Sequence, residues 1–219
     1  MGRCWNLSIC ILLLHFNAFA ASKPHVVSLG RWTSISVRSE DREKQPTVIK
    51  VRALYVDGHA KEFTFGGVHD VTDRTFVVQR IYRINNSLPQ QAGPVQWEWQ
   101  HGGWLLIDRI SGKIQPLALA EFDPDSSVAN WFRDYAAYCG MSEDGQKMSA
   151  VIMQIGRRKP LLKKIFDKAN DVRPSCAPPV WDREPIRVTF SPTPTQKLTF
   201  SVKSRAVDLM TPDESEGGE

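Results

Sequence analysis

The densest group of charged side chains lies between residues 157 and 173. Its cations are Arg157, Arg158, Lys159, Lys163, Lys164, Lys168 and Arg173, and its acids are Asp167 and Asp171. A cluster of like charges attracts anions, with an affinity that falls as salt rises. We therefore predict that Arg157, Arg158, Lys159, Lys163 and Lys164 bind an anionic cell-envelope polymer, lipid head groups or an acidic protein partner. The alternative is a solvated turn and helix face without a ligand.

The second candidate for ligand binding is a pair of indoles. Trp97 and Trp99 lie two residues apart in an otherwise polar segment, so both project from the same face of a predicted strand. We predict that they are exposed and bind a glycan-like ligand. Packing inside a sheet is the favoured interpretation of tryptophans in such strands, because large aromatic side chains dominate sheet interiors, and ligand binding by this pair is the hypothesis set against it. Glu98 points to the opposite face, which weakens the hypothesis that it cleaves a sugar stacked on the indoles.

No motif for catalysis, for a resident metal or for a cofactor stands out. The Gly-x-Ser-x-Gly pattern of nucleophilic hydrolases is absent, since Ser142 is followed by two acids. Two histidines one helical turn apart are absent as well. The acids Glu121, Asp123 and Asp125 leave one alternative open, a secreted hydrolase whose carboxylates meet only in the folded chain.

One acidic stretch has the spacing of a calcium loop. Asp123, Asp125, Ser127 and Asp134 occupy its first, third, fifth and twelfth positions. Val128 stands where such a loop needs glycine for its sharp turn. An acidic connection without a metal is therefore the favoured interpretation.

Residues 1–20 predict a cleavable secretory signal. They contain Arg3 near the amino end, an apolar run from Leu7 to Phe16, and small residues at Ala18 and Ala20. The apolar run is shorter than the roughly 20 residues that span a bilayer, so no stable membrane insertion is expected after cleavage. The mature protein is then expected to be periplasmic or extracellular.

The cysteines agree with an oxidising compartment. Cys4 and Cys10 would leave with the signal, so that Cys139 and Cys176 remain as an even pair. An even pair in an exported protein predicts a disulfide, and two free buried thiols are the alternative. The formal net charge of +4 is only a mild basic excess, which is not typical of a nucleic-acid-binding protein.

Alternating apolar residues and short turns predict strands along most of the chain. The clearest is a hairpin in which Asp57-Gly58 joins Val48–Val56 to Lys61–Phe65. The other expected strands are Phe76–Ile84, Val95–Gln100, Trp104–Ile110, Ile114–Leu119, Lys147–Ile155, Ile186–Phe190 and Leu198–Val202, with a turn at 101–103 and two short strands within 128–140.

Two segments are expected to differ from this pattern. The leucines and lysines of Leu161–Ala169 fit a short amphipathic helix slightly better than a strand. The prolines of Asn170–Pro185 predict an irregular loop that Cys176 ties to the body of the protein. The fold class predicted is all-β, an antiparallel meander with sandwich or blade-like sheets and at most one short helix.

Part of the chain resembles known proteins. The stretch from Gly103-Trp104 through Gly112-Lys113 to Asp144-Gly145 resembles one blade of a β-propeller, in which glycine-containing turns separate apolar strands. The run from Trp97 to Lys164 is similar to that of a family of exported bacterial proteins of unassigned function. This resemblance implies export and a shared fold, and it implies no activity.

These observations predict a secretory signal at 1–20, a single β-rich domain at 21–210 and a disordered acidic tail at 211–219. The expected function is that of an exported binding or interaction protein rather than an enzyme. Its expected partner is an anionic envelope component, and neither nucleic acid nor a cofactor is expected.

Overall fold

The computed structural model describes residues 23–37, 47–87, 95, 97–166, 176–203 and 206–209. The predicted signal and acidic tail, with Lys168 and Arg173 of the basic segment, lie outside these ranges. Within them the chain is all-β, with three antiparallel sheets and no helix. The predicted fold class is therefore confirmed.

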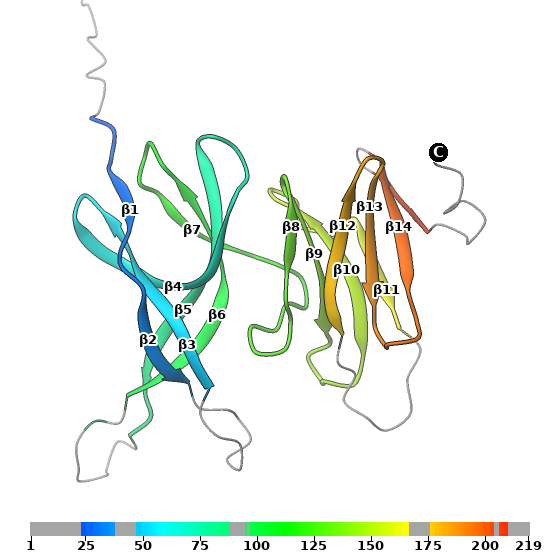
Figure 1. Ribbon diagram of the computed structural model, residues 1–219, viewed down its shortest axis with the longest axis horizontal. Helices are drawn as coiled ribbons and strands as arrows, with labels where there is room; N and C mark the ends of the chain where they lie inside the picture. Colours follow the sequence, from blue (N-terminus) through cyan, green and yellow to red (C-terminus); the bar gives the residue numbers. More distant parts are fainter. Residues whose placement is uncertain are drawn as a thin grey trace, which may run out of the picture.

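The amino-terminal half forms a seven-stranded sheet (Figure 1). Its strands are β1 (Val27–Leu29), β2 (Thr33–Val37), β3 (Thr47–Val56), β4 (His59–Asp70), β5 (Thr75–Asn85), β6 (Trp97–Asp108) and β7 (Ile114–Leu117). The strand order is β1-β3-β4-β5-β6-β7. Strand β2 pairs with the first half of β3, and β1 pairs with the end of the same strand. Asp57 and Gly58 join β3 to β4 with φ values of 53° and 78°. Positive φ at both positions is what a two-residue hairpin turn requires, so this predicted turn is confirmed.

The seven-stranded sheet is coiled, and each half of it buries a different face. Its register shifts between Leu54 and Tyr55, between Phe65 and His69, and between Gln79 and Ile81. Residues three apart on a strand point to opposite faces, as Val51 and Leu54 do on β3 and Val78 and Ile81 on β5, so two separate apolar clusters form. One contains Leu54, Phe76, Val78, Leu105 and Ile107, and the other contains Val37, Val51 and Ile81, against which Trp99 packs.

The predicted turn at 101–103 is wrong, because β6 runs through it without interruption. The register shift opposite Gln79 and Ile81 falls at this point. A Cβ at Gly102 would lie 3.2 Å from the carbonyl oxygen of Arg80. The glycine therefore allows a close approach of β6 to β5 at a bulge, and does not reverse the chain.

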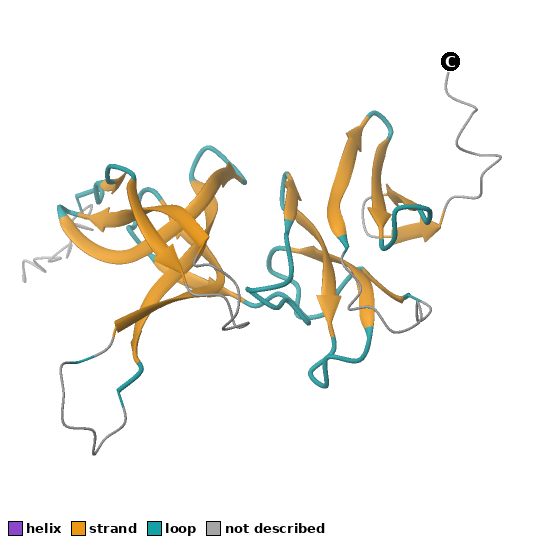
Figure 2. Ribbon diagram, turned by 60° about the horizontal axis from the view of Figure 1, so that its bottom comes forward, coloured by secondary structure: helices purple, strands orange, loops and turns teal. Residues whose placement is uncertain are grey.

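The rest of the chain forms two four-stranded sheets that face each other (Figure 2). One sheet contains β8 (Asn130–Phe132), β9 (Tyr135–Met141), β10 (Met148–Gln154) and β11 (Leu162–Ile165) in the order β11-β10-β9-β8. The other contains β12 (Ala177–Arg183), β13 (Ile186–Ser191), β14 (Leu198–Lys203) and β15 (Ala206–Leu209) in chain order. We call this pair of sheets the sandwich.

The sandwich encloses an apolar core to which β9, β10, β13 and β14 contribute. Buried side chains within it include Ile152, Val188, Phe190 and Phe200, and the last two rings meet edge to face at 5.8 Å. Cys139 of β9 and Cys176, just before β12, lie at disulfide distance with their Cα atoms 6.2 Å apart. The predicted cysteine pair thus connects the two facing sheets.

The second face of β9 and β10 is also covered. The segment between β7 and β8 packs on Ala136, Tyr138, Val151 and Met153. Tyr138 donates a hydrogen bond to the carbonyl oxygen of Ala120 at 2.6 Å. Burial on both faces explains why residues 148–153 are apolar or small without alternation.

The short helix expected within Leu161–Ala169 is wrong for the part that the structure describes. Residues Leu162–Ile165 form β11, which pairs with β10 from Ser149 to Ile152. The two lysines lie on opposite faces at the edge of this sheet, where a long charged side chain reaches solvent on either side. The spacing of leucine and lysine fits both structures, and pairing with β10 selects the strand.

The irregular loop expected at Asn170–Pro185 is also wrong for its carboxyl half, which forms β12. Pro178 and Pro179 lie in this strand, where the register with β13 shifts between Ala177 and Val180. Proline is tolerated at an edge strand and at a bulge, because no ladder hydrogen bond is lost there.

The seven-stranded sheet contacts the sandwich through two histidines. His69 Nε2 lies 2.7 Å from the carbonyl oxygen of Arg133, and its ring stacks on Trp131 at 5.9 Å. His101 Nδ1 lies 2.9 Å from Asp125 Oδ1. His69 and His101 therefore help to join the two parts of the structure, together with Trp104, which meets Trp131 at 5.1 Å.

Candidate functional site

The structure separates the residues of the predicted basic site. Arg157, Arg158 and Lys159 are exposed in the turn between β10 and β11, and we call these three residues the basic turn. Lys163 and Lys164 follow in β11 on opposite faces of the sheet. Within the described ranges, none of the three cations of the basic turn forms an ion pair or a side-chain hydrogen bond. Lys163, in contrast, pairs with Glu121.

The two predicted tryptophans lie on the other part of the molecule and differ in burial. Trp97 at the start of β6 is 55% exposed, whereas Trp99 is partly buried against the apolar cluster that contains Ile81. Phe63 of β4 is 41% exposed and meets Trp99 edge to face at 5.3 Å. Trp97 and Phe63 are thus the exposed rings of this surface, and Trp99 packs against the apolar cluster beneath it.

Arg83 of β5 completes this surface, and sequence analysis missed it. Its register partner is Trp99, and Trp97 is the diagonal neighbour on the same face. The guanidinium carbon lies 5.1 Å from the ring centroid of Trp97 and 5.6 Å from that of Trp99. We call Phe63, Arg83, Trp97 and Trp99 the aromatic–arginine patch. Only the pairing of β5 with β6 shows that Arg83 belongs with these rings.

A polar pocket of about 480 Å³ opens at the edge of the β8–β11 sheet. Its lining residues are Glu121, Ser142, Glu143, Asp144, Lys147, Ser149, Lys163 and Ile165. Glu121 lies at its inner side with a positive φ of 56°, and its carbonyl oxygen accepts a hydrogen bond from the backbone N–H of Met141. Lys163 is the one cation of the predicted binding set that lines this pocket.

The carboxylate of Glu121 is fully engaged. Ser149 Oγ donates a hydrogen bond to one carboxylate oxygen at 2.9 Å, and the ammonium group of Lys163 bonds the other. Lys163 and, to a smaller extent, Ser149 hold the pKa of Glu121 below its ordinary value. Burial, with a smaller contribution from the charge of Glu121, raises the pKa of Tyr138 behind it. Glu121 is therefore an ionised structural group near neutral pH.

Two acids of the pocket, Glu121 and Asp144, do not have the properties that glycoside cleavage requires of a proton donor. Such a reaction needs one carboxylic acid that stays protonated, with a raised pKa, opposite an ionised partner. Asp144 accepts hydrogen bonds from the hydroxyl of Ser142 and the backbone N–H of Gln146, which lower its pKa. Because the pKa of Glu121 is lowered as well, neither acid is arranged as a proton donor.

The other acids named from sequence are used locally. Asp123 accepts hydrogen bonds from the backbone N–H of Asp125 and the hydroxyl of Ser126, and Asp134 accepts one from Gln154. Asp125 bonds His101. The four residues with calcium-loop spacing therefore bind different partners, and no three acids, histidines or cysteines of the described chain converge as metal ligands.

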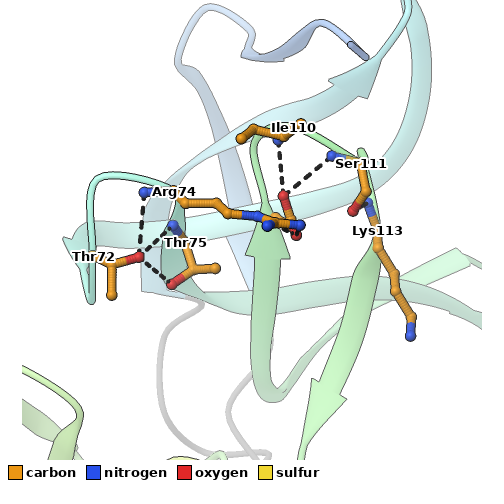
Figure 3. A network of polar contacts seen from close by, with 7 residues as sticks. Thr72, Arg74, Thr75, Ile110, Ser111 and Lys113 are labelled. Carbon is orange, nitrogen blue, oxygen red and sulfur yellow. Dashed lines mark hydrogen bonds and ion pairs between the residues drawn. The ribbon is translucent and has the colours of Figure 1, made fainter. Parts of the chain in front are cut away.

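Another polar network lies at the end of β6, around Asp108 (Figure 3). The carboxylate accepts hydrogen bonds from Arg74 Nε at 2.8 Å and from the backbone N–H groups of Ile110 and Ser111 at 2.9 and 3.1 Å. These contacts, above all that of Arg74, lower the pKa of Asp108. Every donor comes from one of two adjoining turns, so the network joins the β4–β5 turn to the β6–β7 turn.

Comparisons with known proteins assign no family to this chain. No family model, no curated protein and no solved structure matches it. The resemblance to an exported family and to propeller blades therefore stays a prediction. The described part of the chain contains no helix that is long and apolar enough to cross a membrane.

Proposed function

We propose that this protein is an exported binding module that holds an anionic polymer of the cell envelope. The observation that carries the proposal is the basic turn, three consecutive cations that are exposed on a hairpin and have no carboxylate partner in the described chain. Cations without intramolecular partners attract polyanions, and the rigid strands β10 and β11 fix their position. Export is supported by the signal-like residues 1–20 and by the cysteine pair at disulfide distance.

A binding role also accounts for the state of the charged groups. Lys163 and Glu121 neutralise each other, and Arg74, Arg80 and Arg109 each pair with a carboxylate. The basic turn differs from all of these cations. Glu121 and Asp144 of the polar pocket have lowered pKa values and would not act as proton donors, which favours binding over hydrolysis.

Retention of the purified mature protein on immobilised polygalacturonate tests this proposal. We expect retention that falls steeply as sodium chloride rises from about 50 mM to about 500 mM, because screening weakens exposed charge contacts. Replacement of Arg157, Arg158 and Lys159 by alanine should strongly reduce retention at the lower salt concentration.

A control variant separates a localised site from total charge. Replacing Lys113, Lys197 and Lys203, which are exposed and dispersed, by alanine removes the same net charge. This control should keep its retention. Equal losses in both triple variants, or unchanged retention of the basic-turn variant, would contradict the proposal.

A further inference from the structure

We infer that the aromatic–arginine patch is a binding site for a sugar ring that carries a carboxylate or phosphate group. The inference rests on the proposed function, since it names the chemical class of the polymer units that a second surface would recognise. Its carrying observation is separate, namely a guanidinium group that lies over two indole rings and pairs with no carboxylate of the described residues.

The geometry leaves the binding groups of Arg83 available. A guanidinium group that stacks on a ring uses its flat face, while its N–H groups point outward in the plane. These N–H groups form the paired hydrogen bonds that carboxylate and phosphate oxygens accept. Arg83 is exposed, so its edge is open to solvent.

Other stacked arginines of the same sheet show what is unusual about Arg83. Arg80 lies over Tyr82 and pairs with Glu62, and Arg109 lies over Phe76 and pairs with Asp70. Each of these two cations is neutralised within the protein.

Within the described chain, Arg83 has no such carboxylate partner. The neighbouring acid, Glu98, is the register partner of Ile84 and therefore points to the opposite face, where it bonds Asn86. Arg52 also has no carboxylate partner in that part of the chain, but it is half-buried over Trp32 and its Nε is covered. Among the stacked arginines of the seven-stranded sheet in the described chain, Arg83 is thus the accessible cation without a carboxylate partner.

The aromatic groups around Arg83 supply the second half of the site. Trp97 is 55% exposed and Phe63 is 41% exposed, although both belong to regular strands. Exposed rings on either side of a cation that has no carboxylate partner among the described residues form a surface that is apolar at its edges and positive at its centre. A sugar ring has C–H groups that pack on an aromatic side chain, and its acidic substituent would reach Arg83. A neutral sugar lacks the charge contact, and a simple polyanion lacks the ring contact.

Calorimetric titration with three probes tests this assignment. The probes are hexagalacturonate, which has rings and carboxylates, cellohexaose, which has neutral rings, and polyphosphate, which has charge alone. We expect hexagalacturonate to bind at least about tenfold more tightly than either other probe. Arg83→Ala and Trp97→Ala should each weaken hexagalacturonate binding about tenfold, and Arg83→Lys should lie between them and the unaltered protein, because lysine keeps the charge without the planar fork.

The matched control is Lys203→Ala, which removes one exposed positive charge from the other part of the molecule and lies outside the basic turn. It should change hexagalacturonate binding less than about twofold. Far-UV circular dichroism and thermal unfolding establish that each variant is folded. Polyphosphate binding as tight as hexagalacturonate, or unchanged binding by Arg83→Ala and Trp97→Ala, would overturn the inference.

A competition experiment with a sugar phosphate distinguishes recognition of a carboxylate from recognition of a phosphate. Glucose 6-phosphate that competes with hexagalacturonate at the patch would extend the site to phosphorylated rings, and failure to compete would restrict it to carboxylates. The triple variant of the basic turn separates the two proposals. If the patch is correct, that variant binds hexagalacturonate as tightly as the unaltered protein although its retention on the polymer is reduced.

Discussion

Breaking the cysteine pair should lower the stability of the sandwich more than any surface substitution. Cys176→Ala is the appropriate change, because Cys176 is half-buried while Cys139 is 7% exposed and packs in the core. The variant removes the crosslink and leaves the buried sulfur of Cys139 in place. A measured loss then reports mainly the crosslink and not a new cavity.

The expected magnitude follows from the length of chain that the bond closes. The two cysteines are 37 residues apart. On the chain-entropy relation, a loop of this size restricts the unfolded chain by about 4 kcal/mol at 25 °C. For a protein of this size, that corresponds to a melting temperature lower by about 8 to 16 °C.

Thermal unfolding should be followed by near-UV circular dichroism for oxidised wild type, reduced wild type and Cys176→Ala. Reduced wild type and the variant should melt together, well below the oxidised protein, and reductant should not change the variant. A thiol-labelling mass measurement establishes the redox state at the start. If the oxidised protein contains no free thiol and still melts within about 2 °C of Cys176→Ala, the loop-closure argument is refuted.

Two further predictions concern Glu121 and Gly140, which lies against it. Because Lys163 lowers the pKa of folded Glu121, this acid contributes stability that is present above its unfolded pKa and is lost as pH falls through the folded pKa. Urea unfolding between about pH 7 and about pH 3 should therefore show a smaller acid loss for Glu121→Gln than for wild type, and parallel curves would contradict this. At Gly140 a Cβ would lie 3.0 Å from Val151 Cγ2 and 3.1 Å from the Glu121 carbonyl oxygen, whereas nothing lies within 4 Å at Gly103. Gly140→Ala should cost about 1 to 3 kcal/mol in the same assay and Gly103→Ala less than about 0.5 kcal/mol, and equal effects would count against the close contact.

Local patterns predicted most of the strands because the relevant physics is local. Alternation in 186–190 and 198–202 specifies one buried and one solvated face, and these segments form β13 and β14. Asp57-Gly58 predicts its turn because few residue pairs accept positive φ twice in succession. Such features depend only on neighbouring residues in the chain.

Predictions failed where a distant strand decides the local structure. Gly102 and Gly103 are residues typical of a turn, yet they form a bulge within β6 because this strand stays paired with β5 on both sides of them. Leu162–Ile165 has a spacing that fits a helix, yet the free edge of β10 pairs with it. In both segments the intrinsic preference is weak, so hydrogen bonding to a neighbouring strand selects the conformation.

The sequence alone determined the all-β class, most of the strands and the cysteine pairing, because backbone preference, side-chain alternation and an even count of cysteines are properties of the chain itself. Only the tertiary structure decided which charges are neutralised and which stay free. Lys163 meets Glu121, and Arg83 lies over Trp97 and Trp99. Those contacts depend on strand register and on long loops, which bring together side chains that no local pattern relates.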